Sequence, residues 1–239
     1  MNMTGKRVLV TGAASGIGRA SALVLAELGA ELLLCDRTPL GDARAQVEAL
    51  GATCTEAQGD LTSDDFIANL LSGGRLHAVA HCAAILESRY WREDSNWRDR
   101  FHRVMDVNVR VPLQLAAACI DHMADHGGGN IVLVGSVAGK TGGTSPNTPP
   151  DYAASKGAVH ALVKLLSRQA VGRGVLVNAV APGPVQTAMT TGFTVSNALP
   201  MGRMGQAVEL AWPIAFLCTP AASYLSGAIL DVNGGAFVG

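Results

Sequence analysis

The chain has 239 residues, of which 49% are hydrophobic and 15% charged, and its formal net charge is −1. This composition excludes a disordered chain, and the near-neutral charge excludes the basic surface typical of a nucleic-acid-binding protein. Five cysteines lie in apolar runs and six histidines lack metal-ligand spacing, so we expect reduced core thiols and no metal site. The short apolar run near Met1 is neither a signal peptide nor a membrane span, which predicts a cytoplasmic protein without membrane contact.

Short apolar runs alternate along the chain with longer stretches of helical periodicity. The predicted strands are Arg7–Thr11, Glu31–Cys35, Thr53–Ala57, Ala78–Cys82, Ile131–Gly135, Val175–Val180 and Ile229–Val232. The predicted helices are Gly16–Leu28, Leu40–Leu50, Asp64–Leu71, Phe101–His126, Tyr152–Arg173 and Ala207–Leu217. This alternation predicts an α/β fold of one domain over residues 1–239. Its core is a doubly wound, mostly parallel, seven-stranded sheet with helices on both faces, Rossmann-like, whose ligands bind beyond the carboxyl ends of the strands.

The first predicted strand leads into a glycine-rich turn, Thr11–Gly18, which opens the first helix. Gly12, Gly16 and Gly18 permit a tight turn that brings backbone N–H groups and a helix N-terminus close to a pyrophosphate. Their Gly-x₃-Gly-x-Gly spacing differs from the commoner Gly-x-Gly-x₂-Gly pattern, and an ordinary glycine turn is the alternative. The strand before the turn and the helix after it favour a nucleotide.

Asp36 ends the second predicted strand, where a carboxylate can accept hydrogen bonds from the ribose of adenosine and repel a 2′-phosphate. Arg37 supports the opposite preference, because an arginine here could receive that phosphate. Ser15 adds no second positive charge inside the glycine turn. We therefore expect NAD rather than NADP.

Tyr152 and Lys156 lie four residues apart near the start of a predicted helix, so they share one face. A nearby ammonium group lowers the pKa of a phenol toward the range that general acid/base catalysis needs. Ser136, at the end of a buried strand, can hydrogen-bond a substrate oxygen. Asn108 is a polar residue in an apolar helical stripe, where it is either solvated or holds a water joined to Lys156.

These ordered motifs resemble those of the short-chain dehydrogenase/reductase family, in its single-domain form, over essentially the whole chain. They are Thr11–Gly18, Asp60-Leu61, Asn108, Ser136, Tyr152–Lys156, Pro182-Gly183 with Thr187, and residues 227–235. The resemblance implies that Tyr152 is the general acid/base and that Ser136 positions the substrate oxygen. It further implies that Lys156 binds the nicotinamide ribose and lowers the pKa of the tyrosine, while Asn108 anchors a proton-relay water. The residues it implies for cofactor binding are Gly12, Ser15, Gly16, Ile17, Gly18, Asp36, Asp60, Leu61, Ala83, Tyr152, Lys156, Pro182, Gly183, Val185 and Thr187.

The chain departs from the family pattern at two places. It has Cys82-Ala83-Ala84 where the family has Asn-Ala-Gly, so only a backbone role is carried over to Ala83. The loop Ala138–Asp151 is also longer than usual. We expect it to reshape one wall of the substrate pocket.

The segments expected to contact the substrate carry the weakest sequence signals. Thr187–Pro200 predicts a flap whose apolar face carries Met189, Phe193, Val195 and Leu199. Arg89, Tyr90 and Trp91 are candidate rim residues, although an ordinary surface role is the stronger alternative. This arrangement suits a small-to-medium secondary alcohol or ketone.

The predicted function is therefore an oxidoreductase that moves a hydride between NAD(H) and such a substrate. One alternative is an NADPH-dependent carbonyl or 3-oxoacyl-thioester reductase that uses Arg37. Another is a non-catalytic nucleotide-binding regulator, which would not need Asn108, Ser136, Tyr152 and Lys156 together. By resemblance we also expect a homotetramer.

Overall fold

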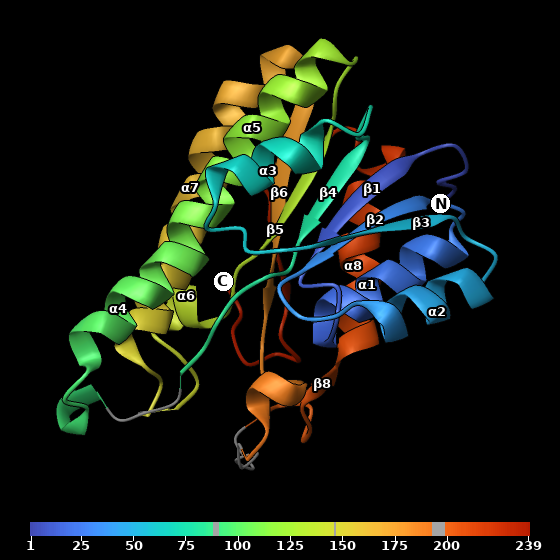
Figure 1. Cartoon of the computed structure of the whole chain (residues 1–239). Helices are drawn as coiled ribbons and strands as arrows, with labels where there is room; N and C mark the ends of the chain where they lie inside the picture. The colour runs from blue at the N-terminus through green and yellow to red at the C-terminus, as the bar shows by residue number, and fades with distance from the viewer. Residues whose placement is uncertain (88–90, 146, 193–198) are drawn as a thin grey trace.

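Seven parallel strands form one sheet in the order β3-β2-β1-β4-β5-β6-β9 (Figure 1). The computed structural model describes residues 1–87, 91–145, 147–192 and 199–239. The strands are β1 Arg7–Thr11, β2 Glu31–Asp36, β3 Cys54–Gln58, β4 Ala78–His81, β5 Gly129–Val134, β6 Val175–Pro182 and β9 Ile229–Val232. The predicted doubly wound parallel sheet is confirmed, with some strand ends shifted by one or two residues.

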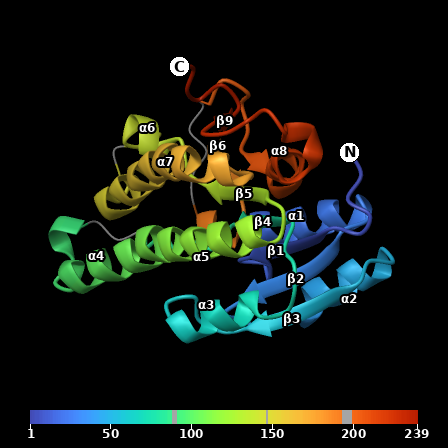
Figure 2. The ribbon, with the colours of Figure 1, turned by 90° about the horizontal axis from the view of Figure 1, so that it is seen from above.

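Helices cover both faces of this sheet (Figure 2). On one face lie α1 Gly16–Glu27, α2 Gly41–Ala49 and α8 Ala207–Cys218; on the other lie α3 Asp64–Leu71, α5 Val111–Asp125 and α7 Pro150–Ala170. Strand side chains alternate between the two layers, so that Leu32 and Leu34 pack with the first while Leu33 packs with the second. No helix in the described part of the chain is long and apolar enough to cross a bilayer.

The prediction of one regular helix over Phe101–His126 is wrong in detail. The helix begins earlier, as α4 Trp97–Met105, passes through a π-helical turn at Asp106–Arg110, and continues as α5. Pro112 accounts for the change, because proline has no N–H to donate to the carbonyl four residues back and its ring clashes with it. The irregular turn carries Asn108.

Shorter elements frame the sheet edge at which the strands end. α6 Ala138–Thr141 occupies part of the segment predicted as a loop. β7 Val185–Gln186 and β8 Gly205–Gln206 pair in parallel and join the two ends of the predicted flap. α7 starts at Pro150, before Tyr152, because proline suits the first position of a helix. Short 3₁₀ turns lie at Trp91–Glu93, Val171–Arg173, Ala188–Thr190 and Pro220–Ala222.

A buried histidine ends β4 in the middle of the sheet. His81 is 4% exposed, and its Nδ1 lies 2.8 Å from the Thr11 hydroxyl, which also accepts the Ala83 N–H at 3.2 Å. The Thr11 hydroxyl thus accepts one backbone N–H and shares a hydrogen bond with Nδ1, while Nε2 has no partner among the described residues. Burial, with the charge of Lys156 adding to it, lowers the pKa of His81 to about 3.

This histidine should make the folded protein less stable in acid. In the unfolded chain its pKa is about 6.5, so below that pH the unfolded state binds a proton that the folded state does not. The contribution of His81 to the free energy of unfolding is constant above about pH 6.5. As the pH falls from there toward 3, the free energy of unfolding decreases by about 1.4 kcal/mol per pH unit. Urea unfolding of the wild type and His81→Asn from about pH 7.5 downward measures the effect. We expect a shallower pH dependence in the variant; equal slopes would contradict a neutral buried His81.

Candidate functional site

The turn after β1 is built against the chain that leaves β4. Gly12 has a φ of +68°, and a Cβ at this position would lie 2.9 Å from the backbone nitrogen of Ala83. A Cβ on Gly18 would lie 2.1 Å from the Gly12 carbonyl oxygen. Both positions therefore require glycine, and the turn presents backbone rather than side chains at this edge of the sheet.

The N-terminus of α1 is open to an anionic group. Ser15 is the exposed N-cap residue, and its side chain makes no capping hydrogen bond within the described residues. Gly16, with a φ of +54°, faces Thr187: a Cβ built on it would lie 3.4 Å from the Thr187 methyl carbon. Ile17 packs against the core beneath the turn. A helix start with free N–H groups and no acidic side chain in its first turn fits a pyrophosphate.

Asp36 binds the glycine turn to the end of β2. Its Oδ2 accepts the Ala14 N–H at 3.0 Å, and its Oδ1 accepts both the N–H and the hydroxyl of Thr38 at 2.9 Å. A carboxylate has about four acceptor positions, so these three bonds leave Oδ2 capacity for a ribose hydroxyl. The neighbouring Arg37 is exposed. The carboxylate thus has a structural role that the sequence did not indicate, beside the predicted one.

The remaining predicted cofactor residues lie where other strands end. Asp60 and Leu61 follow β3; Asp60 is exposed and accepts the Thr62 N–H at 2.9 Å, whereas Leu61 is buried in the core. Pro182 ends β6, Gly183 packs closely on Asn233, and Val185 is buried in β7. The structure therefore brings the predicted residues to the edge formed by the carboxyl ends of the strands.

Ser136, Tyr152 and Lys156 meet where β5 ends against α7. Ser136 is buried two residues after β5, and its Oγ accepts the Ala138 N–H at 3.1 Å. Lys156 is 3% exposed; its Nζ lies 5.7 Å from the centroid of the Tyr152 ring and donates to the Val134 carbonyl at 2.8 Å. The helical spacing correctly placed the tyrosine and the lysine on one face.

Burial controls the ionisation of this group of residues. It raises the pKa of Tyr152, while a hydrogen bond with the Ser136 side chain acts in the opposite direction. It also lowers the pKa of Lys156 to about 8. The expected lowering of the tyrosine pKa by Lys156 is not evident, because the ammonium lies over the ring and bonds to a backbone carbonyl. Ser136 is the neighbour that favours the phenolate.

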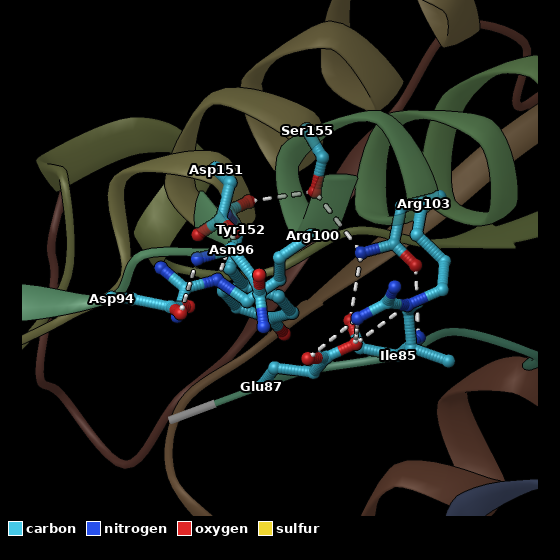
Figure 3. Close-up of polar contacts among 10 residues, drawn as sticks. Ile85, Glu87, Asp94, Asn96, Arg100, Arg103, Asp151, Tyr152 and Ser155 are labelled. Carbon is cyan, nitrogen blue, oxygen red and sulfur yellow. Dashed lines mark hydrogen bonds and ion pairs between the residues drawn. The ribbon is translucent and has the colours of Figure 1, made fainter. Parts of the chain in front are cut away.

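The side chain of Asn108 connects the π-helical turn that carries it to the chain after β4 and to α7. Its partners Ile85 and Ser155 are labelled in Figure 3. Its Oδ1 accepts the Ile85 N–H at 2.9 Å, and its Nδ2 donates to the Ile85 carbonyl at 2.9 Å and to the Ser155 hydroxyl at 3.1 Å. Ser155 in turn donates to the Tyr152 carbonyl at 2.7 Å. The side chain of Asn108 therefore holds the chain after β4 against α7, instead of being solvated.

The segment Cys82-Ala83-Ala84, which replaces the family's Asn-Ala-Gly after β4, keeps a backbone hydrogen bond to β1. Ala83 donates to the Thr11 hydroxyl, as described for the core. Burial raises the pKa of Cys82 to about 12, and a hydrogen bond with Ser21 opposes this. The thiol is therefore protonated at neutral pH and is no nucleophile.

Several residues around the site were not singled out from the sequence. Arg100 on α4 bonds to Asp94 and to Asp151, the residue before Tyr152. His160 lies one turn beyond Lys156 on α7, and its Nε2 accepts the Ser136 N–H at 3.4 Å. The signal for Arg100 was present, because it precedes buried Val104 and Asn108 at intervals of four on one helix face.

The flap and rim are described only in part. Among the predicted flap residues, Met189 is exposed and Leu199 partly buried, while Phe193 and Val195 lie outside the described residues. Of the rim candidates, Trp91 is exposed, and Arg89 and Tyr90 also lie outside the described residues. A cavity of about 110 Å³ is lined by ten residues: Pro184, Leu199, Met201, Arg203, Gly205, Glu209, Leu210, Val232, Asn233 and Gly234.

Comparison with known proteins gives full-length matches. The family model described as Enoyl-(Acyl carrier protein) reductase matches residues 12–236. Galactitol 2-dehydrogenase (L-tagatose-forming) of Cereibacter sphaeroides is 37% identical, over 98% of this chain and 95% of its own. The 3-oxoacyl-(acyl-carrier-protein) reductase of Pseudomonas aeruginosa is 32% identical over all of both chains. A solved structure from Beutenbergia cavernae, described as a candidate NAD(P)-dependent gluconate 5-dehydrogenase with NADP bound at low occupancy, is 33% identical with a TM-score of 0.90, over 98% of each chain.

Proposed function

Because the chain belongs to the short-chain dehydrogenase/reductase family of oxidoreductases, we propose that it interconverts a secondary alcohol and a ketone with NAD(H). The glycine turn with Gly12 and Gly16, together with Asp36, would hold the dinucleotide, which would supply the hydride acceptor for oxidation and the hydride donor for reduction. The observation that carries the proposal is the meeting of Ser136, Tyr152 and Lys156 at the sheet edge on which the glycine turn also opens. A polyhydroxylated substrate is favoured, since the galactitol 2-dehydrogenase is 37% identical to this chain.

The chain's own residues would handle the proton. In oxidation the substrate hydroxyl loses its proton to the Tyr152 phenolate as hydride leaves the same carbon; in reduction the tyrosine returns it. The buried Ser136 hydroxyl, which lowers the pKa of the tyrosine, would orient the substrate oxygen. Lys156 would contribute positive charge only below about pH 8, because burial lowers its pKa to about 8. In this scheme the tyrosine is the group that exchanges a proton with the substrate.

The preference for NAD rests on Asp36. Its remaining acceptor capacity suits a ribose hydroxyl, and its negative charge would repel a 2′-phosphate. A second candidate is an NADPH-dependent carbonyl or 3-oxoacyl-thioester reductase. Two observations favour it: Arg37 is exposed beside Asp36, and the Pseudomonas aeruginosa reductase matches over the full chain.

A spectrophotometric comparison of substrates and cofactors distinguishes the two candidates. We expect NAD-dependent oxidation of galactitol or a related polyol. The kcat/KM with NAD should exceed that with NADP. The corresponding difference in activation free energy is ~1–3 kcal/mol, the size of a charged hydrogen bond together with an avoided repulsion. Asp36→Asn should narrow this gap, because it removes the charge while keeping an oxygen acceptor for the glycine turn.

Comparable efficiency of the wild type with both cofactors would contradict the role of Asp36. Reduction of acetoacetyl thioesters with NADPH, faster than any oxidation with NAD, would establish the second candidate instead. An unchanged NAD preference in Asp36→Asn would assign the carboxylate to the glycine turn alone.

Tyr152→Phe tests the proposed proton transfer. General acid/base groups contribute about 10²–10⁴-fold to the rate. Turnover should therefore fall by a factor of at least about 10², while the affinity for NADH is unchanged. In the wild type, oxidation should rise with pH as the phenol ionises, since the phenolate is the base. Turnover at several pH values, with NADH titrated by fluorescence, measures both. Tyr224→Phe is the matched control, because Tyr224 is fully exposed; near-normal turnover in Tyr152→Phe would reject the assignment.

A further inference from the structure

A buried ion cluster joins α4 to the first turn of α7 (Figure 3). Arg100 is 1% exposed and donates from Nη1 to Asp94 Oδ2 at 2.7 Å and from Nε to Asp151 Oδ2 at 3.1 Å. Both carboxylates are themselves buried, with side-chain exposures of 5% for Asp94 and 1% for Asp151. We refer to these three residues as the Arg100 cluster.

Asp151 connects the cluster to Tyr152. Its second oxygen, Oδ1, accepts the N–H of Tyr152 at 3.0 Å. Asp151 lies in the first turn of α7, where the helix dipole favours a negative charge. The contacts therefore run from the guanidinium through one carboxylate to the backbone of the tyrosine.

The cluster is poorly suited to stabilising the fold. It places two carboxylates against one guanidinium, a net charge of −1, and Nη2 of Arg100 is buried with no partner among the described residues. The free-energy cost of removing such charges from water is commonly so large that apolar side chains of the same volume would stabilise the fold at least as well. A guanidinium is well suited, however, to orienting two carboxylates at once, because its donors form a rigid planar fork. The arrangement therefore indicates a role in orientation.

The same helix also holds the segment that follows β4. Asn108, in the π-helical turn, binds Ile85 at the start of that segment, and Arg100 binds Asp94 at its end. Each of the two side chains also contacts α7, Asn108 through Ser155 and Arg100 through Asp151. Arg100 on α4 and Asn108 in the π-helical turn thus each connect α7 to a residue that follows β4.

We propose that Arg100 is a positioning residue for the reaction, fixing the first turn of α7, and with it Tyr152, against the segment that ends at Asp94. The inference rests on the proposed function of Tyr152 as proton donor and acceptor. Arg100 itself exchanges no proton and touches no reacting atom. Its hydrogen bond to the first turn of α7 is made through Asp151.

Paired substitutions test this role. Arg100→Met removes the Nε donor. Asp151→Asn is nearly isosteric and leaves one acceptor oxygen, so the side chain can accept from Arg100 Nε or from the Tyr152 N–H but no longer from both. We expect each to lower kcat for galactitol oxidation with NAD by about tenfold to a hundredfold, as a small misplacement of a reacting group does. The Kd for NADH, measured by fluorescence, should remain within about twofold, since the cluster is distant in the chain from the glycine turn. The double variant should lose no more than the poorer single variant, because both remove one interaction.

Arg103→Met is the matched control. Arg103 lies on the same helix and pairs with Glu87. Arg103 is exposed and Glu87 is half-buried, and neither contacts α7 by a hydrogen bond or ion pair among the described residues. It should leave kcat unchanged. Wild-type kcat in folded Arg100→Met, or losses that multiply in the double variant, would overturn the proposal. If Arg100→Met does not fold, Asp151→Asn alone supplies the comparison.

Titration of Tyr152 gives a second measurement that needs no substrate. Among the described residues, the charged or titratable groups around this part of α7 lie on the helix, on α6 and at the ends of β4 and β9. They are Lys156, His160 and Lys164 on α7, Lys140 on α6 with its partner Asp231, His81 and Cys82, and the Arg100 cluster. Charges about 10 Å apart at an effective dielectric constant of about 20 change a pKa by about one unit. Arg100→Met removes a cation and should raise the pKa of Tyr152, whereas Asp151→Asn removes an anion and should lower it.

The titration is read as the ultraviolet absorbance difference between each variant and its Tyr152→Phe counterpart. Opposite shifts in the two variants support the cluster's link to the tyrosine, since a purely structural disturbance would not change sign. Shifts of the same sign, or none, would overturn it. Wild-type protein inactive on every alcohol and ketone would overturn the proposed function, whereas an active wild type whose kcat is unchanged in folded Arg100→Met would overturn this inference alone.

Discussion

In a sheet where β1 and β4 lie side by side and run in the same direction, the chain leaves both strands at one edge. The two departing segments approach so closely that a Cβ on Gly12 would touch the backbone of Ala83. This contact sits where the strand order reverses, between β1, which pairs next with β2, and β4, which pairs next with β5. Such a reversal opens a crevice beyond the strands, and every proposed functional residue is placed relative to it.

A second constraint is the low exposure of the groups that would handle the proton. Lys156 and Ser136 are buried at the end of β5, and burial moves the pKa of Lys156 toward neutrality and that of Tyr152 away from it. Hydrogen bonds to backbone and to Ser136 compensate for part of this cost. Arg100 on α4 and Asn108 in the π-helical turn connect to α7, which carries Tyr152 and Lys156, so the position of the tyrosine depends on residues from separate stretches of chain.

Much of this arrangement follows from local sequence patterns. Alternating apolar runs and helical periods identified the seven strands, and the residues that follow them identified the site edge. Local patterns did not predict the π-helical turn, which depends on Pro112 acting on a carbonyl one turn earlier. They also did not predict the Arg100 cluster or the second role of Asp36, because partners such as Asp151 and Ala14 are brought close only by the fold. The homotetramer and the single-domain boundary stay predictions.

The family and fold are established, and the central proposal is hydride transfer between NAD and a secondary alcohol carbon at this edge of the sheet. Its most direct test is isotopic. Galactitol deuterated at its secondary carbons is incubated with the protein and NAD, and the NADH formed is analysed by mass spectrometry. The account predicts that the NADH carries deuterium from the alcohol carbon. NADH formed without the label, or no reduction of NAD by galactitol or any other alcohol tested, would contradict it.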